Sequence, residues 1–380
     1  MFEFSDVVFG AVSRARRIDV ARDYDAVVVI QRSNPPTDAH VRNVKAAASV
    51  GHFAISVKGS SYHPRTVKNP LTDEEVEATW TEIFKNDADV RDKLRFVRVR
   101  DYFDNEKWKR NVEKQVYEVL AKQGISRDRA RVAILGHSKD ETSFYLTMFP
   151  DWDQIEVPNY QGLNATDVRK LFYDADNLAS HWPMIATMVP AATVGMLKSL
   201  ALLPAYEHLV AEYRYIKRIL GDEQKFRELK KNPDWELNTN AADAVILCND
   251  HVLMGYRGGV YGHGQLAFPG GIKGKETFLD AALRELFEET TLSFTKSYFI
   301  QNYLRGSQVF DHPGRSQAGI RVTMAFFFDM GNHPLQEVWG KDDMAKRRMV
   351  WVPRKEWQAY ASQMFEDHDS IGDYFLHIYD

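Results

Sequence analysis

The segment from Gly270 to Leu292, with the sequence GGIKGKETFLDAALRELFEETTL, constrains the fold more than any other part of the chain. Its apolar residues recur every three or four positions, which predicts an amphipathic helix. Residues three and four apart are neighbours on a helix, so Glu285, Glu288 and Glu289 place three carboxylates on one side. These like charges repel one another unless a hard cation lies among their oxygens, and Mg²⁺ prefers carboxylate, water and phosphate ligands. The segment therefore predicts a metal-binding helix.

This segment resembles the Nudix box, the signature of hydrolases that cleave nucleoside diphosphates linked to another group. The resemblance rests on Gly270, on Glu276 and on the run from Arg284 to Glu289, all after a Phe-Pro-Gly-Gly turn. It implies that Mg²⁺, or Mn²⁺ in its place, binds the three glutamates as catalytic ligands and that Arg284 orients them. Thr291 stands where the family has glycine, so we expect a helix end without a left-handed glycine. A solvated acidic helix surface is the alternative interpretation, but the joint spacing is far more specific than a run of charges.

The composition describes a globular protein without an obvious polyanionic partner. The 380 residues suggest two or three domains, with 44% hydrophobic and 27% charged residues. The net charge of -4 provides no general attraction to nucleic acid or to an anionic membrane. A single cysteine, Cys248, excludes an intramolecular disulfide, fits a reducing compartment and is expected to be a core residue. Because no apolar stretch approaches the ~20 residues of a membrane span and no secretory signal is visible, we expect a cytoplasmic protein.

The N-terminal half begins, after an arginine-rich extension at residues 1–22, with a β-branched run at residues 24–30. Such a continuous apolar run is typical of a strand buried on both faces of a parallel sheet. Two prolines in the following loop end the strand, and helical periodicity begins near Thr37. A loop that leads from a first strand into a helix offers free backbone N–H groups and a positive dipole end, so it predicts a phosphate site.

This loop resembles the (H/T)xGH motif of the nucleotidylyltransferases. Thr37 and His40 match the motif, and Arg32 with Pro35 fits its nicotinamide-nucleotide adenylyltransferase version. The resemblance implies that His40 is catalytic, adding positive charge, and that Arg32 and Thr37 contact the nucleotide. Ala39 departs from the motif, because the family has a glycine that lets phosphate approach the backbone. A capped helix without a ligand is the alternative interpretation of this loop taken alone.

Two further segments follow in the order expected for the same transferases. Residues 65–72 resemble the family's second loop, in which Asn69 would contact the nucleotide from the active-site wall. His137 ends a strand predicted at residues 131–137, and Lys139 lies in the turn that follows it. Because ligands bind outside the carboxyl ends of strands in open parallel sheets, we expect both side chains to contact the nucleotide.

Residues 162–169 precede a predicted helix and resemble the (S/T)xxxR signature, which closes over the triphosphate in these transferases. Either Asn164 or Thr166 is expected to cap the helix. The resemblance implies that both residues contact the nucleotide and that Arg169 is catalytic. An ordinary capped helix is the alternative, but the ordered occurrence of both signatures between alternating strands and helices favours function.

From about residue 24 onward, the chain resembles the bifunctional nicotinamide-nucleotide adenylyltransferase/Nudix hydrolases of the ADP-ribose pyrophosphatase branch. The resemblance implies an α/β protein with an N-terminal Rossmann-like nucleotidylyltransferase domain and a C-terminal α/β/α Nudix domain. The expected parts are an extension at 1–22, the transferase domain at 23–182, a helical connector at 183–238 and the Nudix domain at 239–380.

The implied activities are two. Adenylyl transfer from ATP to nicotinamide mononucleotide would produce NAD and pyrophosphate, and Mg²⁺-dependent hydrolysis of ADP-ribose would produce AMP and ribose 5-phosphate. Two rivals stay open: a first half that only binds nucleotide or serves assembly, or one that uses another acceptor, such as a cytidylyl or pantetheine substrate. Homo-oligomerisation also stays open.

Two segments late in the C-terminal half, 309–316 and 321–328, resemble a loop and a strand of the ADP-ribose-hydrolysing branch. Arg315 and Arg321 could reach phosphate there, although a solvated loop charge and a strand-edge charge are equally good interpretations. Glu366 is a candidate base for activating water, with a helix-capping role as an equally good alternative.

Overall fold

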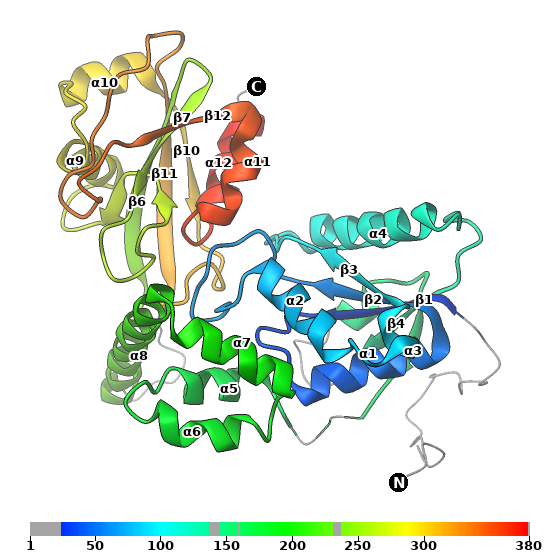
Figure 1. Ribbon diagram of the computed structural model, residues 1–380. Coiled ribbons are helices and arrows are strands. Elements are labelled where there is room, and N and C mark those ends of the chain that lie inside the picture. Colours follow the sequence, from blue (N-terminus) through cyan, green and yellow to red (C-terminus); the bar gives the residue numbers. More distant parts are fainter. Residues whose placement is uncertain (1–23, 137–144, 159, 161, 231–236, 379–380) are drawn as a thin grey trace. The chain divides into compact units, whose positions relative to one another are not determined.

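The computed structural model describes residues 24–136, 145–158, 160, 162–230 and 237–378 (Figure 1). They form two compact units. The first contains residues up to 61 together with 73–172 and 177–198, and the second contains 62–72, 173–176 and 199 onward. The predicted extension at 1–22 and the predicted nucleotide contacts His137 and Lys139 lie outside the described residues.

The first unit is built on five parallel strands in the order β3-β2-β1-β4-β5. The strands are β1 (Tyr24–Gln31), β2 (Gly51–Lys58), β3 (Leu94–Arg98), β4 (Val132–Gly136) and β5 (Asp153–Glu156). The central strand β1 is the β-branched run predicted from the sequence, and its Val28 lies opposite Ile55 of β2 and Ile134 of β4. All three valines and the alanine at the centre of β1 are fully buried, which explains why the run has no polar alternation.

Helices cover both faces of this sheet. Two of them, α1 (Asp38–Val50) and α4 (Asn105–Lys122), contact its strands directly. The other helices of this half are α2 (Asp73–Ile83), α3 (Ala88–Arg91), α5 (Ala165–Phe172), α6 (Leu178–Ile185) and α7 (Ala191–Ala201). Val112, Val116 and Leu120, spaced four residues apart on α4, pack against one face of the sheet. Figure 1 shows α1 on the opposite face. The predicted Rossmann-like α/β architecture is confirmed.

The order of the strands directs attention to one edge of the first unit. The chain places β2 on one side of β1 and β4 on the other, so the direction of the connections reverses at β1. In open parallel sheets, ligands bind beyond the carboxyl ends of the strands at such a reversal. The loop between β1 and α1, which carries Thr37 and His40, lies at this position.

The second unit is organised around a hairpin of β6 (Thr239–Cys248) and β7 (His251–Tyr256). Asn249 and Asp250 between them have positive φ angles of 46° and 58°, the geometry of the two-residue turn that suits the twist of hairpins. These two residues therefore form a tight turn between paired antiparallel strands. The main strand order is β10-β11-β6-β7-β12. The other strands are β8 (Leu266–Ala267), β9 (Gly270–Ile272), β10 (Leu304–Phe310), β11 (Arg321–Asp329) and β12 (Val350–Pro353).

Helices sandwich the second sheet. One layer contains α9 (Phe278–Glu289) and α10 (Lys296–Tyr303), and the other contains η2 (Arg354–Glu356), α11 (Trp357–Tyr360), η3 (Ala361–Gln363) and α12 (His368–Ile378) (Figure 1). Along β6, Ala244 and Ile246 face the core with α9, whereas Val245 and Leu247 face the core with Trp357. The predicted α/β/α layering of the C-terminal domain is confirmed. The helices that the structure describes include none long and apolar enough to cross a membrane.

Helix α8 (Pro204–Lys230) packs as part of the second unit. The side chain of its Glu212 is buried and accepts a hydrogen bond from the Gly262 backbone N–H at 3.1 Å. The ring of Tyr213 lies 5.0 Å from that of Tyr173, in one of the short segments that the second unit takes from the N-terminal half. The aromatic residues of the predicted connector region thus help to build the second unit.

Candidate active sites

The first site begins at the N-terminus of α1. Thr37 is the N-cap residue, fully buried and in an extended conformation, and the helix starts at Asp38 as its sequence predicts. The Nδ1 atom of His40 accepts the Thr37 backbone N–H at 3.0 Å and lies 2.9 Å from the Thr37 hydroxyl oxygen. Because Nδ1 is an acceptor, the neutral ring carries its proton on Nε2. The loop thus presents an Nε2–H donor.

His40 does not bring the positive charge expected from the sequence. Burial lowers its pKa to about 4, and the nearby Arg169 guanidinium lowers it further. The imidazole is therefore neutral at pH 7. Its contribution to a phosphate site is a hydrogen bond, and Arg169 supplies the charge.

Arg169 joins the two predicted transferase signatures. One terminal nitrogen donates to the Asn34 carbonyl oxygen at 2.8 Å, and the other donates to the Thr166 hydroxyl at 3.0 Å. The helix that carries it, α5, is capped by Asn164, whose Oδ1 accepts the Asp167 N–H at 3.0 Å. Asn164 is therefore the cap, while Thr166 orients the arginine. Residues 135 positions apart in the sequence meet beside the β1–α1 loop.

The remaining predicted contacts of the first site are placed differently. The Arg32 side chain is exposed. Asn69 belongs to segment 62–72, which packs within the second unit, and its backbone N–H donates to the Thr66 carbonyl at 3.0 Å. Sequence reasoning missed Gln31 and Ser33 at the end of β1, whose buried side-chain polar atoms have no hydrogen-bond partner among the described residues. Their positions at the end of the buried strand and two residues beyond it were the available signal.

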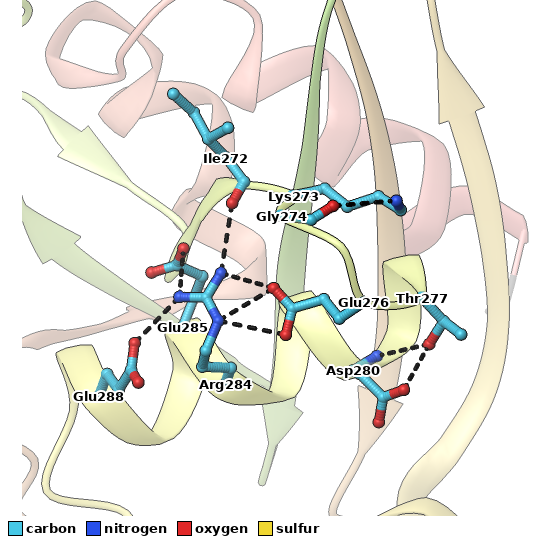
Figure 2. A network of polar contacts seen from close by, with 9 residues as sticks. All are labelled: Ile272, Lys273, Gly274, Glu276, Thr277, Asp280, Arg284, Glu285 and Glu288. Atoms are coloured by element: carbon cyan, nitrogen blue, oxygen red, sulfur yellow. Dashed lines mark hydrogen bonds and ion pairs between the residues drawn. The ribbon is translucent and has the colours of Figure 1, made fainter.

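The second site centres on Arg284 of α9 (Figure 2). Its guanidinium reaches Glu276 at 2.8 Å, Glu285 at 2.9 Å and Glu288 at 3.0 Å, and it also donates to the Ile272 carbonyl at 3.2 Å. Hydrogen bonds from Arg284 lower the pKa of Glu276. Arg284 thus contacts Glu285 and Glu288, two of the three glutamates that it was expected to orient, and Glu276 in place of Glu289.

Glu289 faces the neighbouring strand and is only 4% exposed. Its Oε2 accepts the Gly270 N–H at 2.9 Å. Burial raises its pKa to about 8, and the negative charge of Glu285 raises it further. A Cβ on Gly271 would lie only 2.4 Å from the Glu285 carboxylate, so this glycine permits the close approach of β9 to the acidic helix.

The acids suit a hard divalent cation by donor type and by charge. Burial also raises the pKa of Glu285, and a divalent cation would relieve the repulsion between its carboxylate and that of Glu289. Within the described ranges, no three His, Cys, Asp or Glu side chains are already arranged as a metal-ligand group. Here, Arg284 holds Glu285 and Glu288 instead.

Threonines end the helix where related sequences would have glycine. The C-cap residue Thr290 is extended, with φ -129° and ψ 164°, and its hydroxyl donates to the Leu286 carbonyl at 2.6 Å. The Thr291 hydroxyl accepts the Trp339 N–H at 2.9 Å. The expected end without a left-handed residue is therefore observed, and side chains replace the missing cap.

Arg315 is neither a solvated loop charge nor an open phosphate ligand in this structure. It is 6% exposed and binds both carboxylate oxygens of Asp367, at 2.9 and 2.8 Å. Burial alone would lower its pKa, but the Asp367 carboxylate raises it overall. Arg321 begins β11, and its guanidinium carbon lies 5.8 Å from the centre of the Tyr261 ring.

Glu366 has the left-handed backbone that non-glycine residues rarely adopt, with a φ of 45°. Its carboxylate accepts a hydrogen bond from the Tyr261 hydroxyl. Burial raises its pKa, and the positive charge of Arg321 lowers it in part. Burial thus favours the protonated form of Glu366 more than in water, and the bond to Tyr261 gives this residue a contact other than a helix cap.

Comparison with known proteins supports this division into two sites. A family profile described as the NUDIX domain matches residues 238–372. The C-terminal domain is a NUDIX domain. It contains the whole Arg284 network as well as Arg315, Arg321 and Glu366.

Relatives of the first half and of the whole chain are also known. The nicotinamide/nicotinic acid mononucleotide adenylyltransferase of Acinetobacter baylyi is 28% identical over 192 residues, covering 50% of this chain and 94% of that protein. Two structures of a bifunctional NMN adenylyltransferase/ADP ribose pyrophosphatase from Francisella tularensis, one with AMP and a manganese ion, match 93% of this chain and 99% of theirs. Their TM-scores are 0.77 and 0.78, at 27% and 28% identity. The predicted resemblance to bifunctional enzymes is confirmed.

Three residues near the NUDIX acids were not singled out from the sequence. Asp243 is buried on β6, where Thr323 donates to it at 2.6 Å, and burial raises its pKa to about 6. Burial likewise raises the pKa of Glu212 to about 7. Arg257 directly follows β7, and its charge lies near both acids. An aspartate at the start of an apolar strand was a usable signal for Asp243, whereas Glu212 lies on a helix far from the box in the sequence.

Proposed function

We propose that the chain carries out adenylyl transfer from ATP to nicotinamide mononucleotide in its first unit and divalent-metal-dependent hydrolysis of ADP-ribose in its NUDIX domain. The main support is that both halves match a bifunctional enzyme along 93% of the chain. In the first half His40 lies near Arg169, and in the second half Arg284 binds the box acids. The substrates named for those relatives are thereby proposed for this chain.

The first reaction needs placement and charge neutralisation. A 5′-phosphate oxygen of the mononucleotide attacks the α-phosphorus of ATP, the α–β bridging bond breaks, and pyrophosphate leaves without a covalent enzyme intermediate. The His40 Nε2–H and the N-terminus of α1 would donate hydrogen bonds to phosphate oxygens. Arg169, fixed on the Asn34 carbonyl, would neutralise charge as the α–β phosphoanhydride bond of ATP breaks and the diphosphate linkage of the dinucleotide forms.

In the second reaction, a water oxygen attacks a phosphorus of ADP-ribose and the bond to the bridging oxygen breaks, which releases AMP and ribose 5-phosphate. A divalent cation on Glu285, Glu288 and Glu289 would lower the pKa of the attacking water and neutralise the diphosphate. Arg284 orients two of these carboxylates. Glu366 is the proposed acceptor of the water proton, because its carboxylate is held by Tyr261 in a buried setting.

A product-identified assay of the full chain tests the first activity. Protein, ATP, nicotinamide mononucleotide and Mg²⁺ should produce NAD and pyrophosphate, and Glu289→Gln should leave that rate unchanged. If no dinucleotide forms while His40→Ala still weakens ATP binding, the first unit is a nucleotide-binding module. Faster transfer to a cytidylyl or pantetheine acceptor in direct competition would support the other rival.

A second assay tests the hydrolase. ADP-ribose with Mg²⁺ should yield AMP and ribose 5-phosphate, chelation should stop the reaction, and His40→Ala should leave it unchanged. We also propose Mg²⁺ as the working metal, with Mn²⁺ able to replace it, because both are hard cations that accept carboxylate and phosphate oxygens. If Glu288→Gln and Glu289→Gln together leave cleavage at full rate, the metal assignment is wrong.

The wider setting is part of the same proposal. The slight negative charge favours small nucleotides over nucleic acid as ligands. The buried thiol of Cys248, the sole cysteine, and a requirement for ATP fit the cytoplasm. Light scattering of the purified chain would decide whether it forms homo-oligomers.

A further inference from the structure

Arg257, at the end of β7, is held in one orientation by three contacts. Its Nε donates to the Tyr261 carbonyl at 3.0 Å, and its guanidinium carbon lies 4.1 Å from the centre of the Phe365 ring. Its backbone N–H donates to the Gln265 carbonyl at 2.9 Å. A guanidinium stacked on an aromatic ring and anchored through Nε has its terminal nitrogens fixed in direction.

Those terminal nitrogens, Nη1 and Nη2, have no acceptor among the residues that the structure describes. The charge nevertheless lies close enough to Glu289, Glu212 and Asp243 to lower the pKa of each. Arg257 is thus a cation near three buried acids, of which Glu289 belongs to the box, and it forms no ion pair with any of the three. Arg284 and Arg315, in contrast, have their guanidinium groups engaged by carboxylates.

The turn over this arginine is built to keep it in place. Gly262 has a φ of 70°, and a Cβ there would lie 2.3 Å from the Phe365 ring and 3.2 Å from the Arg257 side chain. Its N–H is held by the buried carboxylate of Glu212 on α8. The turn therefore packs directly on the arginine–phenylalanine stack, and α8 anchors the turn from behind.

We propose that Arg257 binds the diphosphate of the hydrolase substrate through its two terminal nitrogens. The sequence had suggested a phosphate contact of this kind for Arg315. This inference rests on the proposed hydrolase function. A planar guanidinium can donate two parallel hydrogen bonds to phosphate oxygens, which a lysine cannot reproduce. Because stacking and the Gly262 turn fix the group in advance, little side-chain entropy is lost on binding.

The competing explanation is that Arg257 only neutralises the acids around it. That role needs a positive charge but not two parallel donor nitrogens, so Arg257→Lys would preserve it. Binding of ADP-ribose measured by calorimetry in the presence of a chelator separates the two roles without requiring metal or turnover. We expect about 10- to 100-fold weaker binding for Arg257→Ala and an intermediate loss for Arg257→Lys.

Arg347 provides a matched control, because its guanidinium stacks on Tyr256 at 3.2 Å in the same domain but is exposed. Arg347→Ala should bind ADP-ribose like the unchanged protein. Phe365→Leu keeps the Arg257 charge but removes the stack, so it should raise the KM for ADP-ribose with a smaller change in kcat. This variant also keeps the test valid if Arg257→Ala does not fold.

The proposal is overturned if Arg257→Lys binds ADP-ribose as tightly as the unchanged protein, whatever the affinity of Arg257→Ala and even if the melting temperatures of both variants fall. If the unchanged protein binds no ADP-ribose, the substrate assignment fails, and inorganic pyrophosphate then becomes the probe. Weaker pyrophosphate binding by Arg257→Lys would support the diphosphate role of Arg257, and equal binding would refute it.

Discussion

The two sites place ionisable groups in opposite electrostatic surroundings. In the first, burial and then Arg169 lower the pKa of His40, to about 4. In the second, burial and then Glu285 raise the pKa of Glu289, to about 8. The same factor, desolvation, thus favours the neutral form in both, while the neighbouring charges have opposite signs. In the first site the positive charge of Arg169 can bind an anion directly. In the second site the glutamates suit a cation, and that cation could then bind an anion.

The arginines differ in a second way. Arg169 in the first region is held by a carbonyl and a hydroxyl, so its positive charge is not neutralised by those partners. In the NUDIX domain, Arg315 is fully engaged by Asp367 and Arg284 by three glutamates, which leaves Arg257 as the arginine beside the acids without an ion pair in the described chain. In the NUDIX domain, arginine–carboxylate pairs therefore stabilise the fold as well as shape the site.

The largest expected effect concerns the ion pair of Arg315 with Asp367 and is measured as a loss of folding stability. Arg315→Leu leaves Asp367 buried without its partner, so we expect a loss of about 3–5 kcal/mol in the free energy of unfolding of the NUDIX domain. Urea unfolding, followed through loss of hydrolysis, measures it. The double variant with Asp367→Leu should recover much of the loss because no unpaired charge remains. Unchanged unfolding with weakened ADP-ribose binding would instead make Arg315 a substrate ligand.

Glu289→Gln should have the next largest effect and should act on one reaction only. Glutamine keeps the hydrogen bond to Gly270 but cannot supply a charged metal ligand, so hydrolysis should fall roughly 100- to 1000-fold, the loss of several kcal/mol of transition-state stabilisation. Steady-state rates of AMP release provide the measurement, with NAD formation as the internal control. A loss shared by both reactions would show that the sites are not electrostatically separate.

His40→Gln should lower adenylyl transfer by roughly 100-fold, the usual cost of losing one donor at a developing negative charge. Since the His40 pKa is about 4, kcat/KM profiles of the unchanged protein and the variant should have the same shape between pH 5.5 and 8. A cationic histidine would instead add a decline near pH 6.5 to the unchanged protein alone. The same shift predicts that folding stability declines as pH falls from 6.5 toward 4, because the unfolded state binds the proton first.

The smallest effects concern the helix caps and form a matched pair. Asn164 caps the helix of Arg169, and Thr277 caps the box helix by accepting the Asp280 N–H at 3.1 Å. Each alanine substitution should cost about 1 kcal/mol of stability. Asn164→Ala should raise the KM for ATP, and Thr277→Ala should slow hydrolysis, each leaving the other reaction unchanged. Crossed effects in parallel assays would count against independent sites.

Much of the fold was predictable because local pattern and burial coincide. The β-branched run of β1 is buried on all sides, and the hairpin turn at Asn249 and Asp250 has the geometry its residue types favour. The box helix could be predicted for the same reason, since its apolar face meets one core. The partner of Arg315 could not be predicted, because Asp367 lies 52 residues away and periodicity carries no information about that distance.

The sequence alone pointed to the two chemistries through its resemblance to two sets of motifs, one containing His40 and Arg169 and the other the box glutamates. Local helix geometry set the spacing of the glutamates, which share one helix. Only the tertiary structure decided which of the charged residues are available. It buried His40 into its neutral form, paired Arg315 with Asp367 and left the terminal nitrogens of Arg257 without a protein partner in the described residues. The reason is physical: a side chain's charge and its freedom to bind depend on burial and on neighbours from distant segments, which no local pattern encodes.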